Sequence, residues 1–117
     1  MELPHANGLC LLIDDGYTLE GVIAAGRAYP AVKFTYRPAT QREVESYFLA
    51  GRQAPSQVVE TRAKFLATHL CSWDAKDQAG NAVPIREEFL ARINPVVAMM
   101  LVNFVLSQAP LESDLKN

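Results

Sequence analysis

The first part of the chain shows the two-residue alternation of a β-strand. From Val32 to Arg37, apolar and polar side chains alternate, so one face of the segment is apolar and the other faces water. Before it, the apolar run Leu9–Ile13 and the segment Tyr17–Ala25 give two further strands, separated by the turn residues Asp14–Gly16. Pro38 ends the series. The pattern therefore predicts an antiparallel β-meander of two or three strands at the N-terminus.

At Thr40 the pattern changes to the period of an α-helix. Thr40 and Glu43 have the spacing of a capping box, in which a hydroxyl and a carboxylate each accept a hydrogen bond from a backbone N–H at a helix start. The apolar face of this short helix carries Val44, Tyr47 and Phe48. Gly51 is typical of the residue that follows a helix C-terminus, so we expect the helix to end there.

The longest predicted helix begins at Pro55–Ser56, because proline is tolerated in a first helical turn. Its apolar stripe steps by four, three, four and three residues through Val59, Ala63, Leu66, Leu70 and Trp73. The helix is expected to end within Leu70–Asp74, and a tight turn through Asp77–Asn81 then leads to Val83–Ile85. The segment from Val58 to Ile85 is the one around which the rest of the fold is predicted to be arranged.

Two more helices are predicted in the last part of the chain. Arg86–Ile93 has apolar residues at helical spacing, and Asn94–Pro95 combines an N-cap with a first-turn proline. The final helix, Val96–Ser107, is apolar almost all round, which is typical of a helix that is buried within a domain or covered by a second chain. Both interpretations stay open at this point.

Together the patterns predict an α+β fold, in which the N-terminal meander is followed by about four helices packed as a small bundle. A length of 117 residues is typical of a single domain. We expect residues 1–107 to form that domain and residues 108–117 to be a mobile C-terminal tail.

Charge and composition argue against several classes of protein. The net charge is −2 and the eleven basic residues are spread singly, which disfavours nucleic-acid binding. The apolar runs are too short for a signal peptide or for the roughly 20 residues that cross a membrane. Cys10 and Cys71 form no metal-binding or redox motif and are interpreted as inert core thiols. These features predict a soluble protein inside the cell, with no membrane partner.

No catalytic, cofactor-binding or metal-binding motif is found, so the chain is predicted not to be an enzyme and to need no cofactor. His69 lies beside the apolar stripe and is interpreted as a histidine packed in the core or at its rim, while His5 lies near the chain end. A calcium loop starting at Asp74 fails, because Lys76 and Ile85 occupy positions where oxygen ligands are needed.

The candidate functional residues are therefore those of a protein interface. Trp73 is either a core anchor that holds the segment Val83–Ile85 or an interface hot spot, a role in which tryptophan is common. The final helix supplies the strongest indication of a partner, because its apolar surface is more than one helix face needs. The predicted interface residues are Trp73, Val96, Val97, Met100, Leu101 and Phe104.

Four segments follow one another in a characteristic order along the chain: Tyr36-Arg37-Pro38-Ala39-Thr40, Leu70-Cys71-Ser72-Trp73-Asp74, Asp77-Gln78-Ala79-Gly80 and Val83-Pro84-Ile85, the last followed by a helix. In this order, over roughly Val32 to Leu106, the chain resembles the tail assembly chaperones of tailed bacteriophages and prophages. Related sequences often have a threonine helix cap where this chain has Arg86.

The resemblance implies a non-enzymatic protein of the host cytoplasm. It implies binding to the helical tape measure protein and to tail tube subunits during tail assembly, self-association into oligomers, and absence from the finished virion. Two alternatives from phage biology are a virion structural protein, such as a head–tail connector or minor tail protein, and a small adapter or inhibitor that binds a host protein. An enzyme of a type not recognised from sequence is a further alternative.

Overall fold

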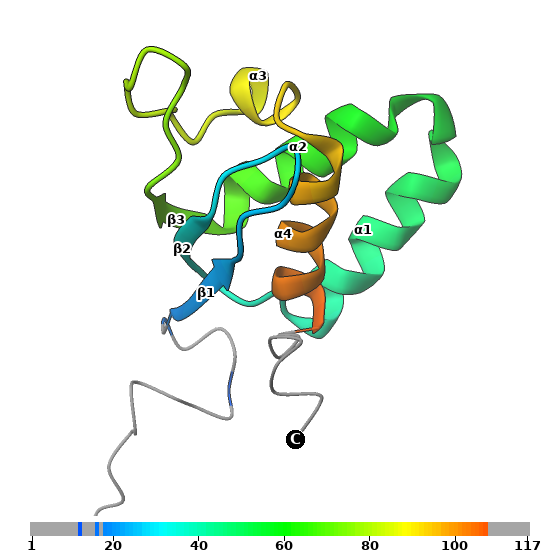
Figure 1. Ribbon diagram of the computed structural model, residues 1–117. Coiled ribbons are helices and arrows are strands. Elements are labelled where there is room, and N and C mark those ends of the chain that lie inside the picture. Colours follow the sequence, from blue (N-terminus) through cyan, green and yellow to red (C-terminus); the bar gives the residue numbers. More distant parts are fainter. Residues whose placement is uncertain (1–11, 13–15, 17, 108–117) are drawn as a thin grey trace, which may run out of the picture.

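The computed structural model describes Leu12, Gly16 and residues 18–107, and it has the predicted α+β fold. Three strands form one sheet, and the helices lie on one side of it (Figure 1). The strands are β1 (Leu19–Ile23), β2 (Val32–Tyr36) and β3 (Leu70–Trp73). The helices are α1 (Gln41–Gln53), the 3₁₀ turn η1 (Pro55–Gln57), α2 (Val58–His69), α3 (Glu87–Leu90) and α4 (Pro95–Ser107).

The sheet is antiparallel in the order β1–β2–β3, so the segment with the clearest alternation, β2, is the central strand. Its apolar side chains are buried, as the alternation predicts. On the opposite face the hydroxyls of Thr35 and Ser72 lie 2.7 Å apart and share a hydrogen bond. β1 is shorter than the predicted segment Tyr17–Ala25 and forms one edge of the sheet.

The third strand corrects the sequence analysis, which assigned Leu70–Trp73 to the end of a helix. α2 ends at His69, and Leu70 has the extended dihedral angles φ −72° and ψ 132°. Leu70 and Trp73 are three residues apart, a spacing that fits one helical turn, so periodicity alone favoured the wrong structure. The strand forms because its backbone groups pair with those of β2. That pairing joins segments 37 residues apart, as Thr35 with Ser72, and local sequence does not report it.

The start of α1 is confirmed and its end is corrected. The Glu43 backbone N–H donates to the Thr40 hydroxyl at 3.1 Å, and the Thr40 N–H donates to Glu43 Oε1 at 2.9 Å, which completes the predicted capping box. The helix does not end at Gly51 but continues to Gln53. Gly51 keeps a negative φ angle and is an ordinary helical residue, whereas a glycine C-cap requires the left-handed region.

The loop and the last helices are close to prediction. The turn at Asp77–Asn81 is confirmed, since Asp77 Oδ1 accepts hydrogen bonds from the backbone of Ala79 and Asn81, and Gly80 has a φ of 88°. α3 is shorter than the predicted helix Arg86–Ile93. α4 begins as predicted, because the Asn94 side chain accepts a hydrogen bond from the Val96 N–H at 2.8 Å.

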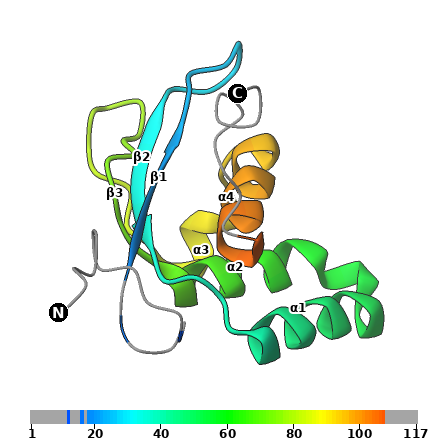
Figure 2. The same cartoon turned by 90° about the horizontal axis from the view of Figure 1, so that it is seen from below.

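The core lies between the sheet and the helices α2 and α4. The ring of Phe104 packs edge-on against Phe34 of the central strand, with 5.1 Å between ring centroids. Figure 2 shows the sheet on one side, α4 next to it, and α1 on the far side, reaching away from the sheet. The predicted strand Leu9–Ile13 apart from Leu12, the turn Asp14–Gly16 apart from Gly16, and the tail 108–117 lie outside the described residues, as do His5 and Cys10.

Candidate protein-binding site

The six predicted interface residues differ in how much of each side chain is exposed. Val97 and Leu101 are core residues with exposed fractions of 5% and 0%, so they can contact a partner only if the protomer opens. Phe104 is half-buried, and its ring packs on Phe34 and Tyr36 of the sheet. α4 therefore combines the two interpretations left open by its sequence, with one buried face and one exposed face.

Trp73 acts as the anchor of the loop that follows β3. Its indole Nε1–H donates to the Val83 carbonyl at 2.7 Å, and the ring is half-buried against the core. This contact ties the segment after the Asp77–Asn81 turn to the edge of the sheet. Trp73 thus has the structural role that the sequence analysis gave as one of its two alternatives.

The exposed face of α4 is apolar in its first half. Val96 and Met99 have exposed fractions of 47% and 54%, and Met100 beside them is half-buried. Asn103 and Ser107 continue the same face toward the C-terminus and are exposed. Val96 and Met100 were predicted interface residues, whereas Met99 was not among them, because a helix that is apolar all round gives no period that marks its exposed side.

A second set of exposed apolar side chains lies on α1 and at the start of α2. None of the residues of α1 is buried, and its Phe48 and Leu49 are 51% and 43% exposed. Val58 and Val59 follow at the start of α2, where the core does not reach. Consecutive residues on a helix point about 100° apart, so adjacent apolar pairs cannot share one narrow buried stripe. That signal was present in the sequence, although the analysis did not use it.

α1 is held to the body of the protein by contacts with α2. The rings of Tyr47 and Phe65 pack with 4.5 Å between centroids. Nearby, the buried His69 joins its Nδ1 to the Phe65 carbonyl at 2.9 Å and places Nε2 3.2 Å from Glu43 Oε1. Of the two predicted positions for this histidine, in the core or at its rim, the structure shows the first. The two helices are therefore linked by a pair of aromatic rings and by a polar pair.

The carboxyl of Glu43 is the polar end of this link. Partial burial raises the pKa of Glu43, but the hydrogen bond from the Thr40 backbone and the contact with His69 lower it by more. The pKa therefore lies below its ordinary value of 4.5, and the carboxylate is charged at neutral pH.

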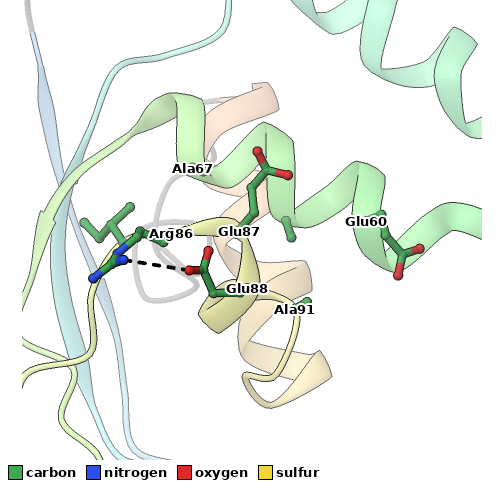
Figure 3. A pocket seen from close by; sticks show the side chains of 8 residues that line it. Glu60, Ala67, Arg86, Glu87, Glu88 and Ala91 are labelled. Atoms are coloured by element: carbon green, nitrogen blue, oxygen red, sulfur yellow. Dashed lines mark ion pairs between the residues drawn. The ribbon is translucent and has the colours of Figure 1, made fainter.

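Two grooves flank α2. The groove between α1 and α2 has a volume of about 470 Å³, and its rim carries Glu43, Glu60, Lys64 and Glu87 around the rings of Tyr47 and Phe65. The groove between α2 and α3, about 620 Å³, has a floor of small residues that includes Ala63, Ala67 and Ala91 (Figure 3). Glu60 and Glu87 belong to the rims of both grooves, so the two hollows share one ridge.

The remaining candidate chemistry is sparse. Cys71 is exposed on β3, which corrects its interpretation as a core thiol. It lies at the irregularity of the β2–β3 pairing, between Ser72, which pairs with Thr35, and Leu70, which pairs with Tyr36. Within the described part of the chain, no three His, Cys, Asp or Glu side chains are grouped so that they could hold a metal ion. No helix in that part is long and apolar enough to cross a membrane.

Comparisons with protein-family models, with curated proteins and with solved structures found no match to this chain. The functional argument therefore rests on the surfaces described above.

Proposed function

We propose that this chain is a non-enzymatic tail assembly chaperone of a bacteriophage or prophage, which acts in the host cytoplasm. In this proposal it binds the tape measure protein, and through it tail tube subunits, by the exposed apolar residues of its helices. The observation that carries the proposal is that α1 buries none of its residues yet exposes Phe48 and Leu49.

The distribution of exposed apolar residues supports a helix-binding role. Among the described residues, six of the eight large apolar side chains that are exposed lie on helices, and they define the apolar helical surface: Phe48, Leu49, Val58, Val59, Val96 and Met99. Methionine and aromatic side chains adapt to different partner surfaces. Helical partners commonly bury an apolar stripe against such a surface. A tape measure protein is expected to offer many stripes of this kind along its length.

The direct test is co-expression with the tape measure protein encoded in the same phage genome. We expect a tape measure fragment to be insoluble alone and to be soluble and co-purified when this chain is present. Phe48→Ser should reduce its recovery about tenfold or more, since aromatic residues at interfaces often contribute about 2 kcal/mol or more. Val22→Ser is the matched control, because Val22 is exposed on the sheet, outside the apolar helical surface.

Purified virions distinguish the competing functions. A chaperone is absent from them, whereas a head–tail connector or minor tail protein is retained at fixed stoichiometry. Stoichiometric binding of a host protein without any tail protein would instead identify an adapter or inhibitor. Either result would contradict the proposal. Light scattering after size exclusion, with and without the tape measure fragment, measures the predicted self-association.

A further inference from the structure

The outer face of α1 carries two opposite charges placed evenly about two exposed apolar residues. Glu45 and Arg52 are seven residues apart, which is nearly two helical turns, so they lie on the same side of the helix. Phe48 and Leu49 lie between them, one on either side of the line that joins the two charges. All four side chains are exposed. The outer face, made of these four residues, therefore has a negative end, an apolar centre and a positive end.

The two charges of the outer face have no partner within the described part of the protomer. The opposite side of α1 faces α2, through the contacts of Glu43 and Tyr47. Neither Glu45 nor Arg52 forms an ion pair with another described residue. Figure 2 shows α1 on the far side of the molecule from the sheet, reaching away from it. Both charges are therefore available to a second protein.

The order of charges on the outer face is complementary to the same face in the reverse direction. Glu45 and Arg52 lie equally far from a point between Phe48 and Leu49. In an antiparallel helix pair with a two-fold axis at that point, Glu45 of each copy faces Arg52 of the other, and the apolar residues meet at the centre. In a parallel pair each charge would face its own equivalent, which is repulsive. The charges therefore select the antiparallel pair.

The exposed apolar face of α4 does not have this property. Its Val96 and Met99 are exposed, but α4 contains no charged residue, so no charge on the helix fixes the direction or register of a partner. Exposed ion pairs add little to affinity, whereas a pattern of charges determines orientation and the choice of partner. The feature that distinguishes α1 is thus the arrangement of its charges rather than the amount of its apolar surface.

We propose that the outer face of α1 binds the same face of a second copy of this chain, as an antiparallel, two-fold symmetric helix pair. Burial of Phe48 and Leu49 supplies the attraction, and two reciprocal Glu45–Arg52 ion pairs set the direction and the register. The inference goes beyond the proposed function, because it concerns the chain alone and does not depend on the tape measure protein.

The length of α1 limits the strength of this contact. With 13 residues at 1.5 Å each, the helix is about 20 Å long, so a single helix pair belongs with the small, reversible interfaces. We expect a dissociation constant on the order of 10–100 μM, so that the chain is monomeric at about 1 μM.

Reversing one charge at a time tests the pairing. In sedimentation velocity experiments from about 1 to 500 μM, the wild type should change from monomer to dimer. Glu45→Arg and Arg52→Glu should each weaken the dimer about tenfold, since two ion pairs are replaced by two contacts between like charges. Circular dichroism checks that α1 stays helical in each variant. If a reversal unfolds it, the neutral variants Glu45→Gln and Arg52→Gln should weaken the dimer about threefold instead.

Mixing the two reversed variants tests the symmetry. In a mixed dimer of Glu45→Arg with Arg52→Glu, the introduced residues face each other and the native Arg52 and Glu45 face each other, so both ion pairs are present again. The equimolar mixture should therefore dimerise as strongly as the wild type. Glu20→Arg and Arg27→Glu make the same charge changes at exposed positions in β1 and in the loop after it, and each should dimerise like the wild type.

Three results would overturn the inference. The first is a wild type that stays monomeric up to about 500 μM, well above the expected dissociation constant. The second is equal weakening by the α1 variants and by the β1 and loop controls, which would show that only net charge matters. The third is a mixture of folded Glu45→Arg and Arg52→Glu that does not recover the dimer, because the helix pair would then not be antiparallel.

The tape measure fragment separates this inference from the proposed function. Phe48 and Leu49 belong both to the outer face of α1 and to the apolar helical surface, so a tape measure helix bound there should displace the second copy. If the chain dimerises as described but captures no fragment, the inference stands and the proposed function is wrong. If the chain captures the fragment but is monomeric at every concentration, the proposed function stands and the inference is wrong.

Discussion

α4 and α1 are helices of equal length that are used in opposite ways. α4 has no charged residue and buries Val97, Leu101 and Val105 among others, whereas α1 is amphipathic and has no fully buried residue. α4 lies between the sheet and α2, where neighbours cover it on several sides, while α1 packs chiefly on α2 (Figures 1 and 2). The difference shows that the apolar pattern of a helix and its place in the layers act together: α4 is apolar and enclosed, whereas α1 carries charged residues and packs on one side only.

The largest expected effect comes from truncating the core side of α4. Leu101 is 0% exposed, so Leu101→Ala removes buried apolar contacts and leaves a cavity, which should lower the free energy of unfolding by about 2–5 kcal/mol. Leu49→Ala makes the same change on α1, where the side chain is 43% exposed, and should alter the free energy of unfolding by no more than about 0.5 kcal/mol. Urea unfolding measures both. Equal losses would mean that α1 is covered, contrary to the comparison.

Two glycines sharpen the contrast between the sheet and α1. Gly21 pairs with Phe34 across the sheet, and a Cβ atom at Gly21 would meet the Phe34 ring, which also packs edge-on against Phe104. We expect Gly21→Ala to destabilise the fold by about 1–3 kcal/mol. A Cβ at Gly51 would meet nothing within 4 Å, so Gly51→Ala should stabilise α1 by up to about 1 kcal/mol. Thermal unfolding should show opposite signs for the two variants.

The smallest expected effect concerns the link between α1 and α2. Glu43→Gln keeps an acceptor for the Thr40 N–H but removes the charge beside His69. Because the folded-state pKa of Glu43 is below 4.5, its charge stabilises the fold above that pH, and the stabilisation is lost as the pH falls through the folded-state pKa. At pH 7 the variant should be less stable by under about 1 kcal/mol, as is usual for a partly exposed pair.

Unfolding measured from pH 7 down to pH 3 tests that effect. The difference between Glu43→Gln and the wild type should shrink as the pH falls below 4.5, because the wild-type carboxyl then becomes neutral as well. A difference that stays constant with pH would show that the charge of Glu43 does not contribute to holding α1. Glu45→Gln, on the outer face of α1, is the control and should show no such pH dependence.

The sequence by itself determined the elements whose signals are local. The alternation of Val32–Tyr36, the capping box of Thr40 and Glu43, the turn at Asp77–Asn81 and the N-cap at Asn94 all formed as predicted. Each depends on groups within a few residues of one another, such as a side chain and the nearby N–H that it accepts from. The α+β class followed from the order of these elements.

Only the tertiary structure decided which apolar residues are covered. Leu70–Trp73 became a strand because β2 supplies its backbone partners, and the buried side of α4 was fixed by the sheet and α2. The groove between α1 and α2 is lined by residues of three elements that come together only on folding, and its Glu43, Glu60 and Glu87 are far apart in the chain. Burial depends on contacts between distant segments, so a pattern read along the chain predicts where a helix lies but does not predict which of its faces remains open.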